Sequence, residues 1–108
     1  MTRGDIVVVA SHGAYTSKPR PALVVQADAF NPTHASISIC PITSDCVDAP
    51  LFRVPLPAGP RTGLAVASQV MIDKVVSVPR EAVGRVIGRC ESIELETIGG
   101  ALRGWLAL

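Results

Sequence analysis

Turn-forming segments divide the apolar part of this chain into short runs, and no run is long enough to form a large helix on its own. The 108 residues include nine prolines and nine glycines, and Val and Ile dominate the runs between them. Such runs, bounded by Pro, Gly, Asn and Asp, are typical of β-strands. We therefore predict strands at Asp5–Ala10, Pro21–Gln26, Ser36–Pro41, Leu51–Leu56, Gly63–Ala67, Met71–Val78 and Gly84–Cys90.

The last segment, residues 91–108, has a different period. Its apolar residues recur three and four positions apart, which places them on one face of a helix: Leu95, Ile98, Leu102, Trp105 and Leu106. Glutamates stand in its first turns, where the helix dipole favours negative charge. After Pro79 we expect a short helical turn. Many short antiparallel strands and a terminal helix predict a mainly β fold, a small barrel-like sheet, in a single domain over residues 1–108.

Composition excludes several classes of protein. No stretch approaches the roughly 18 apolar residues of a membrane span. Three cysteines without C-x-x-C spacing, Cys40, Cys46 and Cys90, make a disulfide framework or zinc site unexpected and favour a reduced, cytoplasmic setting. The net charge of +1 is compatible with a nucleic-acid partner but does not require one. With only two histidines, His12 and His34, we expect no metal site and no cofactor.

One cation is held on an unusually restricted backbone. In "SKPRPALVV" both Lys18 and Arg20 precede a proline, so both are biased towards extended geometry. A guanidinium on a rigid base suits a preorganised anion site. A charged strand entrance would have the same pattern. His12, in the loop before Arg20, is a candidate proton carrier.

Two hydroxyls follow a predicted strand in "PITSD". Thr43 and Ser44 could act on a substrate, or they could make the local turn that Ser, Thr and Asp commonly form with the backbone. These residues alone leave both interpretations open.

The ordered set "RGDIVVV", "KPRPALVVQADAFN", "ICPITSD", "GLAVASQVMIDKVVSVP" and "GWLAL" resembles the MazF/PemK family, the toxins of type II toxin–antitoxin modules. The resemblance extends from Arg3 to Leu108. It implies the CcdB/MazF fold, an SH3-like barrel with a terminal helix. It also implies a homodimer that is neutralised by a cognate antitoxin, whose acidic, flexible segment wraps the toxin and covers the RNA groove.

The activity that the resemblance implies is cleavage of single-stranded RNA without a metal, by attack of the ribose 2′-hydroxyl, leaving a 2′,3′-cyclic phosphate. The family's catalytic arginine falls on Arg20 and its catalytic threonine on Thr43. A guanidinium can bind two phosphate oxygens, and a hydroxyl can donate to the same phosphate. Ser44 matches a serine that follows the threonine in part of the family.

Two positions depart from the family pattern. Many members have a glutamate five residues before the arginine, where this chain has Tyr15, and others have an acid before the glutamine of "SQV", where it has Ser68 before Gln69. No carboxylate therefore matches a general base. Tyr15 or His12 could serve instead, and Tyr15 could alternatively stack on a base. Two loop cations, Lys18 and Arg53, could bind phosphates or only keep the surface soluble.

Two rivals remain open at this point. One is a toxin like CcdB, which poisons DNA gyrase on the same fold without cutting RNA. The other is a catalytically degenerate module that only binds antitoxin. Growth arrest on expression would separate either toxin from the degenerate module, and RNA cleavage would separate the two toxins.

Overall fold

A computed structural model describes residues 1–10 and 18–108. Seven strands are present in this part of the chain: β1 (Asp5–Val9), β2 (Arg20–Val24), β3 (Ser36–Thr43), β4 (Arg53–Leu56), β5 (Ser68–Met71), β6 (Val76–Pro79) and β7 (Val83–Arg89). Two 3₁₀ turns, η1 (Ile72–Lys74) and η2 (Arg80–Ala82), flank β6, and the helix α1 (Ser92–Leu106) follows β7. The mainly β fold with a C-terminal helix is confirmed.

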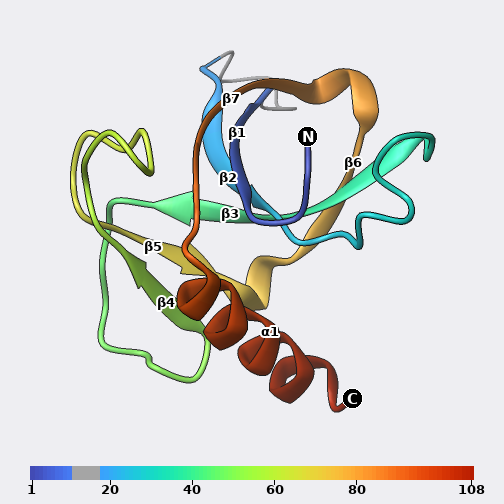
Figure 1. Ribbon diagram of the computed structural model, residues 1–108. Coiled ribbons are helices and arrows are strands. Elements are labelled where there is room, and N and C mark those ends of the chain that lie inside the picture. The colour runs from blue at the N-terminus through green and yellow to red at the C-terminus, as the bar shows by residue number, and fades with distance from the viewer. Residues whose placement is uncertain (11–17) are drawn as a thin grey trace.

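The strands form one antiparallel, strongly bent sheet. Its order is β4-β5-β3-β2-β1-β7, and β6 pairs with β3 beside β5. Figure 1 shows β1, β2 and β7 at one end of the sheet and β4 and β5 at the other, with α1 lying against β4. The long strand β3 connects the two ends because it pairs with three partners, β2, β5 and β6.

The core lies on both faces of the central strands. Ile6 of β1 and Leu23 of β2 belong to a cluster that also contains Ile98 of α1. Their neighbours in sequence, Val7 and Val24, face a second cluster on the opposite side. Because successive side chains of a strand point to opposite faces, burial on both faces requires the continuous apolar runs seen in the sequence.

Two predicted strands were wrong. Residues 63–67 form no strand, because Gly63 adopts a left-handed φ of +72° and donates its N–H to the Gly59 carbonyl, which makes a tight loop. The predicted strand Met71–Val78 is broken by η1, where Ile72 turns into the core. This corner allows β5 to pair with the end of β3 and β6 to pair with its beginning.

The remaining expectations agree with the structure to within a few residues at the element ends. The expected turn after Pro79 is η2, and the terminal helix is α1. Its apolar stripe is only partly buried: Ile98 is fully buried, whereas Trp105 is half exposed and contacts the ring of Phe52 at a centroid distance of 6.0 Å.

Candidate active site

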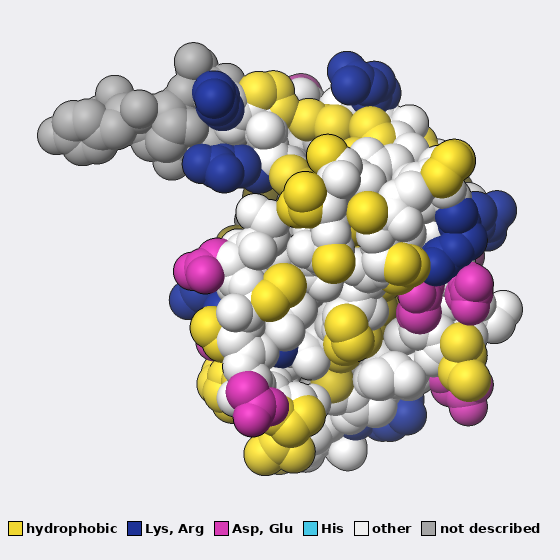
Figure 2. Space-filling model, turned by 90° about the vertical axis from the view of Figure 1, so that its left-hand side faces the viewer, with side chains coloured by type: hydrophobic (Ala, Val, Ile, Leu, Met, Phe, Trp, Pro, Cys, Tyr) yellow, Lys and Arg dark blue, Asp and Glu magenta, His cyan; other side chains and the backbone are white. Residues whose placement is uncertain are grey.

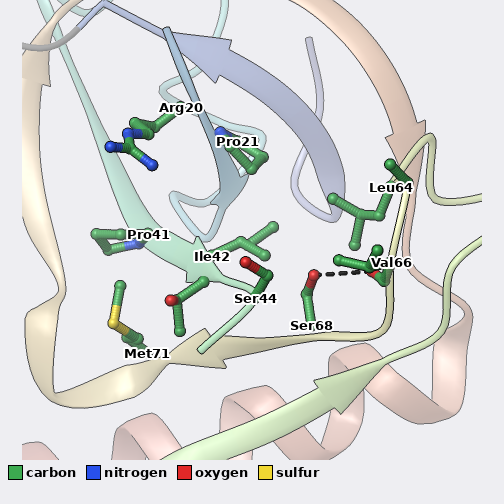
Figure 3. Close-up of a pocket in the computed structure, with 11 residues that line it drawn as sticks. Arg20, Pro21, Pro41, Ile42, Ser44, Leu64, Val66, Ser68 and Met71 are labelled. Atoms are coloured by element: carbon green, nitrogen blue, oxygen red, sulfur yellow. Dashed lines mark hydrogen bonds between the residues drawn. The ribbon is translucent and has the colours of Figure 1, made fainter. Parts of the chain in front are cut away.

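A pocket of about 370 Å³ lies where the beginning of β2 meets the end of β3 (Figure 3). Strands β2 and β3 contribute Arg20, Pro21, Pro41, Ile42 and Thr43. The other lining residues are Ser44, which follows β3, residues 64–66 of the loop before β5, and Ser68 and Met71 of β5. The pocket therefore joins the two stretches, "KPRP" and "PITSD", that the sequence singled out.

Arg20 is the first residue of β2 and pairs with Val9 of β1, so its backbone is part of the sheet. Its side chain is exposed, and Figure 3 shows the guanidinium on the same side of the pocket as Pro41. No side chain or carbonyl within residues 1–10 and 18–108 hydrogen-bonds or ion-pairs with this guanidinium. Its donors are thus available to an anion at the mouth of the pocket.

Thr43 is the last residue of β3, and its hydroxyl is held by the chain that follows. The Asp45 N–H donates to Thr43 Oγ1 at 3.0 Å, the local turn that Thr and Asp favour. A hydroxyl that accepts one hydrogen bond keeps its own proton to donate. The turn and a catalytic use of Thr43 are therefore compatible rather than exclusive.

Ser68 and Ser44 differ in their surroundings. Ser68 is buried in the pocket wall, and its hydroxyl donates to the Val66 carbonyl at 2.9 Å (Figure 3). Ser44 is exposed beside Thr43. Of the pocket-lining residues in the described part of the chain, none is acidic.

Gln69 and Arg53 form hydrogen bonds with the loop between β3 and β4. Gln69 exchanges two hydrogen bonds with the Val47 backbone, and Arg53 Nη1 donates to both Gln69 Oε1 and the Asp45 carbonyl. The structure thus places Gln69 directly opposite Thr43, and the polar groups of both Gln69 and Arg53 are hydrogen-bonded to protein atoms.

Comparison with known proteins supports the family assignment. The model of the PemK-like, MazF-like toxins of type II toxin–antitoxin systems matches residues 2–106. This chain belongs to that family. A probable endoribonuclease MazF of Mycolicibacterium smegmatis is 43% identical over 108 residues, covering 100% of this chain and 98% of the relative.

Solved toxin structures share the fold. A MazF crystal structure from Deinococcus radiodurans has a TM-score of 0.80 at 26% identity, covering 100% of this chain and 97% of that one. A MazE–MazF structure from the same organism gives the same TM-score, identity and coverage. The barrel with a terminal helix is therefore the MazF fold.

Two candidate residues of this toxin, His12 and Tyr15, lie outside the described residues. Lys18 is exposed at the edge of the described part, and Figure 2 shows basic side chains beside the grey segment, above a face with scattered hydrophobic side chains. Within residues 1–10 and 18–108 no three His, Cys, Asp or Glu residues gather as a metal site would require. No helix in these ranges is long and apolar enough to span a membrane.

Sequence reasoning missed the wall formed by residues 64–66, because that segment was assigned to a strand. It did name the local turn at Thr43 as one of two alternatives, and the structure confirms this turn and shows that the Asp45 N–H is the donor.

Proposed function

We propose that this toxin is an endoribonuclease that cleaves single-stranded RNA without a metal and leaves a 2′,3′-cyclic phosphate. The observation that carries the proposal is the placement of Arg20 and Thr43, from two different strands, in the lining of one pocket. Membership of a family that includes a probable endoribonuclease 43% identical to this chain supports the same activity.

The two residues have distinct roles in this reaction. Attack of the 2′-hydroxyl on the adjacent phosphorus builds negative charge on the non-bridging oxygens. The Arg20 guanidinium, which stays protonated, binds these oxygens through its planar fork. The Thr43 hydroxyl donates to the same phosphate and holds it in line for attack. Ser44, exposed beside Thr43, is a second donor to the substrate.

Proton transfer is the step for which the pocket offers no carboxylate. We propose that a residue of the segment before Arg20, His12 or Tyr15, supplies the base, and that Lys18 binds a flanking phosphate. Ser68 takes no direct part, because its hydroxyl donates to the Val66 carbonyl in the pocket wall.

The biological setting follows from the family. We propose that the chain is a single toxin domain, acts in the cytoplasm as a homodimer, and is neutralised by an antitoxin whose acidic segment covers the Arg20 pocket. MazE–MazF structures from D. radiodurans support an antitoxin partner for this toxin as well.

The test is a cleavage assay on a long RNA of mixed sequence in the presence of EDTA, with toxin free of antitoxin. Variants Arg20→Ala and Thr43→Ala are assayed beside the wild type. Discrete fragments with cyclic-phosphate ends, lost in both variants, support the proposal. Intact RNA over a wide range of enzyme concentration overturns it, and gyrase inhibition would then be measured, followed by antitoxin binding.

A further inference from the structure

The loop between β3 and β4, residues 44–52, is fastened to β5 beside Thr43. In the antiparallel pair of β3 and β5, Thr43 lies directly opposite Gln69. Directly opposed residues point to the same face of a sheet with their Cβ atoms about 5 Å apart. The Gln69 side chain is therefore a direct cross-strand neighbour of the Thr43 side chain.

The Gln69 side-chain amide pairs with the Val47 backbone through two hydrogen bonds, as a backbone amide does in a β-sheet. Its Oε1 accepts from the Val47 N–H at 3.1 Å, and its Nε2 donates to the Val47 carbonyl at 2.9 Å. Oε1 accepts a second hydrogen bond, from Arg53 Nη1 at 3.0 Å. Both lone pairs of this oxygen are thus occupied by protein donors.

Arg53 extends the same network to the residue that holds Thr43. Its Nη1 also donates to the Asp45 carbonyl at 3.1 Å, while the Asp45 N–H donates to Thr43 Oγ1 at 3.0 Å. Both backbone polar groups of Asp45 are therefore hydrogen-bonded: the carbonyl accepts from Arg53, and the N–H donates to the Thr43 hydroxyl. A continuous chain of hydrogen bonds runs from Gln69 through Arg53 and Asp45 to Thr43.

We propose that Gln69 and Arg53 are positioning residues that hold the 44–52 loop and thereby orient the Thr43 hydroxyl, and that neither binds RNA. The claim that these residues affect catalysis rests on the proposed ribonuclease activity. The claim that they hold the 44–52 loop does not. Misplacing a catalytic group by about 1 Å can cost about 10²-fold in rate without weakening substrate binding. The expected signature is a fall in kcat at nearly constant KM.

Three variants separate positioning from RNA contact. Gln69→Met keeps the length of the side chain and removes its hydrogen bonds. Arg53→Lys keeps the positive charge, which suffices for a phosphate contact, but the lysine side chain is one atom shorter and does not place a nitrogen at the position of Nη1, which donates to both Asp45 and Gln69. Gln26→Met is the matched control, because Gln26 likewise accepts from a backbone N–H, that of Ser38 at 3.1 Å, but on another edge of the fold.

Kinetics on one short RNA give the first readout. We expect kcat to fall about 10- to 100-fold in Gln69→Met and Arg53→Lys, with KM and the salt dependence of binding unchanged, and Gln26→Met to behave as wild type. A raised KM in either variant would mean that the lost group contacted RNA, and an undiminished kcat in Arg53→Lys would mean that a positive charge alone suffices at this position; either result would overturn the proposal.

Amide hydrogen exchange gives a second readout that needs no activity. Protection of the Val47 amide should be lost in Gln69→Met, while amides of β1, β2 and α1 stay protected and show that the variant is folded. If the Val47 amide stays protected in Gln69→Met, the claim that Gln69 holds the loop is overturned, whatever the cleavage rate of this variant. If the wild type cleaves no RNA, the proposed function fails and exchange alone decides on the loop.

Discussion

Arg61 and Glu94 join the loop after β4 to the first turn of α1 through two parallel hydrogen bonds, Nη1 to Oε1 at 2.8 Å and Nη2 to Oε2 at 3.1 Å. Arg61 also donates to the Arg89 carbonyl, and Glu94 Oε1 accepts the Glu91 N–H at the helix start. This bidentate pair therefore fixes the helix against the chain segment that walls the pocket.

The pair has a consequence for pH dependence. Burial raises the pKa of Glu94, but the hydrogen bonds from Arg61 and Glu91 and the charge of Arg61 outweigh burial, so this pKa lies below its ordinary value of 4.5. A lowered folded pKa stabilises the native state above the unfolded pKa, and this contribution is lost as pH falls through the folded value.

We therefore expect Glu94→Gln to be less stable than wild type to urea at pH 7. The difference should shrink steadily as pH falls below about 4.5, the ordinary pKa of glutamate. Glutamine keeps one oxygen that can accept the Glu91 N–H, but it loses the charge and the second acceptor for Arg61, so the comparison measures the whole bidentate pair. A stability difference that stays constant across this pH range would contradict the assignment.

Close contact between β7 and the preceding loop gives a test at Gly88. A Cβ added there would lie 2.2 Å from the carbonyl carbon and 2.2 Å from the oxygen of Thr62. We expect Gly88→Ala to lower the free energy of unfolding by about 1–3 kcal/mol or more, because backbone atoms must move.

The control for this substitution is Gly104→Ala in α1. Nothing lies within 4 Å of its added Cβ. Alanine is the better helix former by about 1 kcal/mol, so this variant should be more stable than wild type. Urea unfolding of both variants checks the pair, and destabilisation by Gly104→Ala would show that this helix face has another role.

The three cysteines should differ sharply in reactivity. Burial raises the pKa of Cys40 to about 12 and that of Cys90 to about 12, whereas Cys46 is exposed. Because the thiolate is the reactive form, an aromatic disulfide reagent at pH 8 should modify one thiol in the native protein and three after unfolding. Modification of Cys40 in the native protein, located by mass spectrometry, would contradict the burial of this residue in the core.

The Thr43 hydroxyl can be tested without changing the shape of its side chain. Thr43→Val removes the hydroxyl and should lower kcat about 10²–10³-fold, the typical loss for one preorganised donor. Thr43→Ser keeps the hydroxyl and the hydrogen bond from Asp45, so it should retain most of the rate. Cleavage of a short RNA measures both, and a valine variant as active as wild type would remove Thr43 from the chemistry.

Local sequence was sufficient for most elements. Runs of Val and Ile between turn residues indicated five of the seven strands closely, and the change to helical spacing indicated α1. The failures, residues 63–67 and the break at Ile72, are places where tertiary contacts override propensity. At Gly63 the Ile87 carbonyl lies so close that a side chain has no room, and Ile72 leaves the strand to fill the core.

The sequence by itself determined the residue types of the candidate site: a guanidinium on a backbone restricted by two prolines, and a hydroxyl at the end of a strand. Only the tertiary structure decided that they share a pocket, because the antiparallel pairing of β2 with β3 aligns the beginning of one strand with the end of the other. It also decided that Gln69 and Arg53 face the loop. Their partners are backbone groups of Asp45 and Val47, whose positions depend on how the loop folds against β5 and are not encoded by any local pattern.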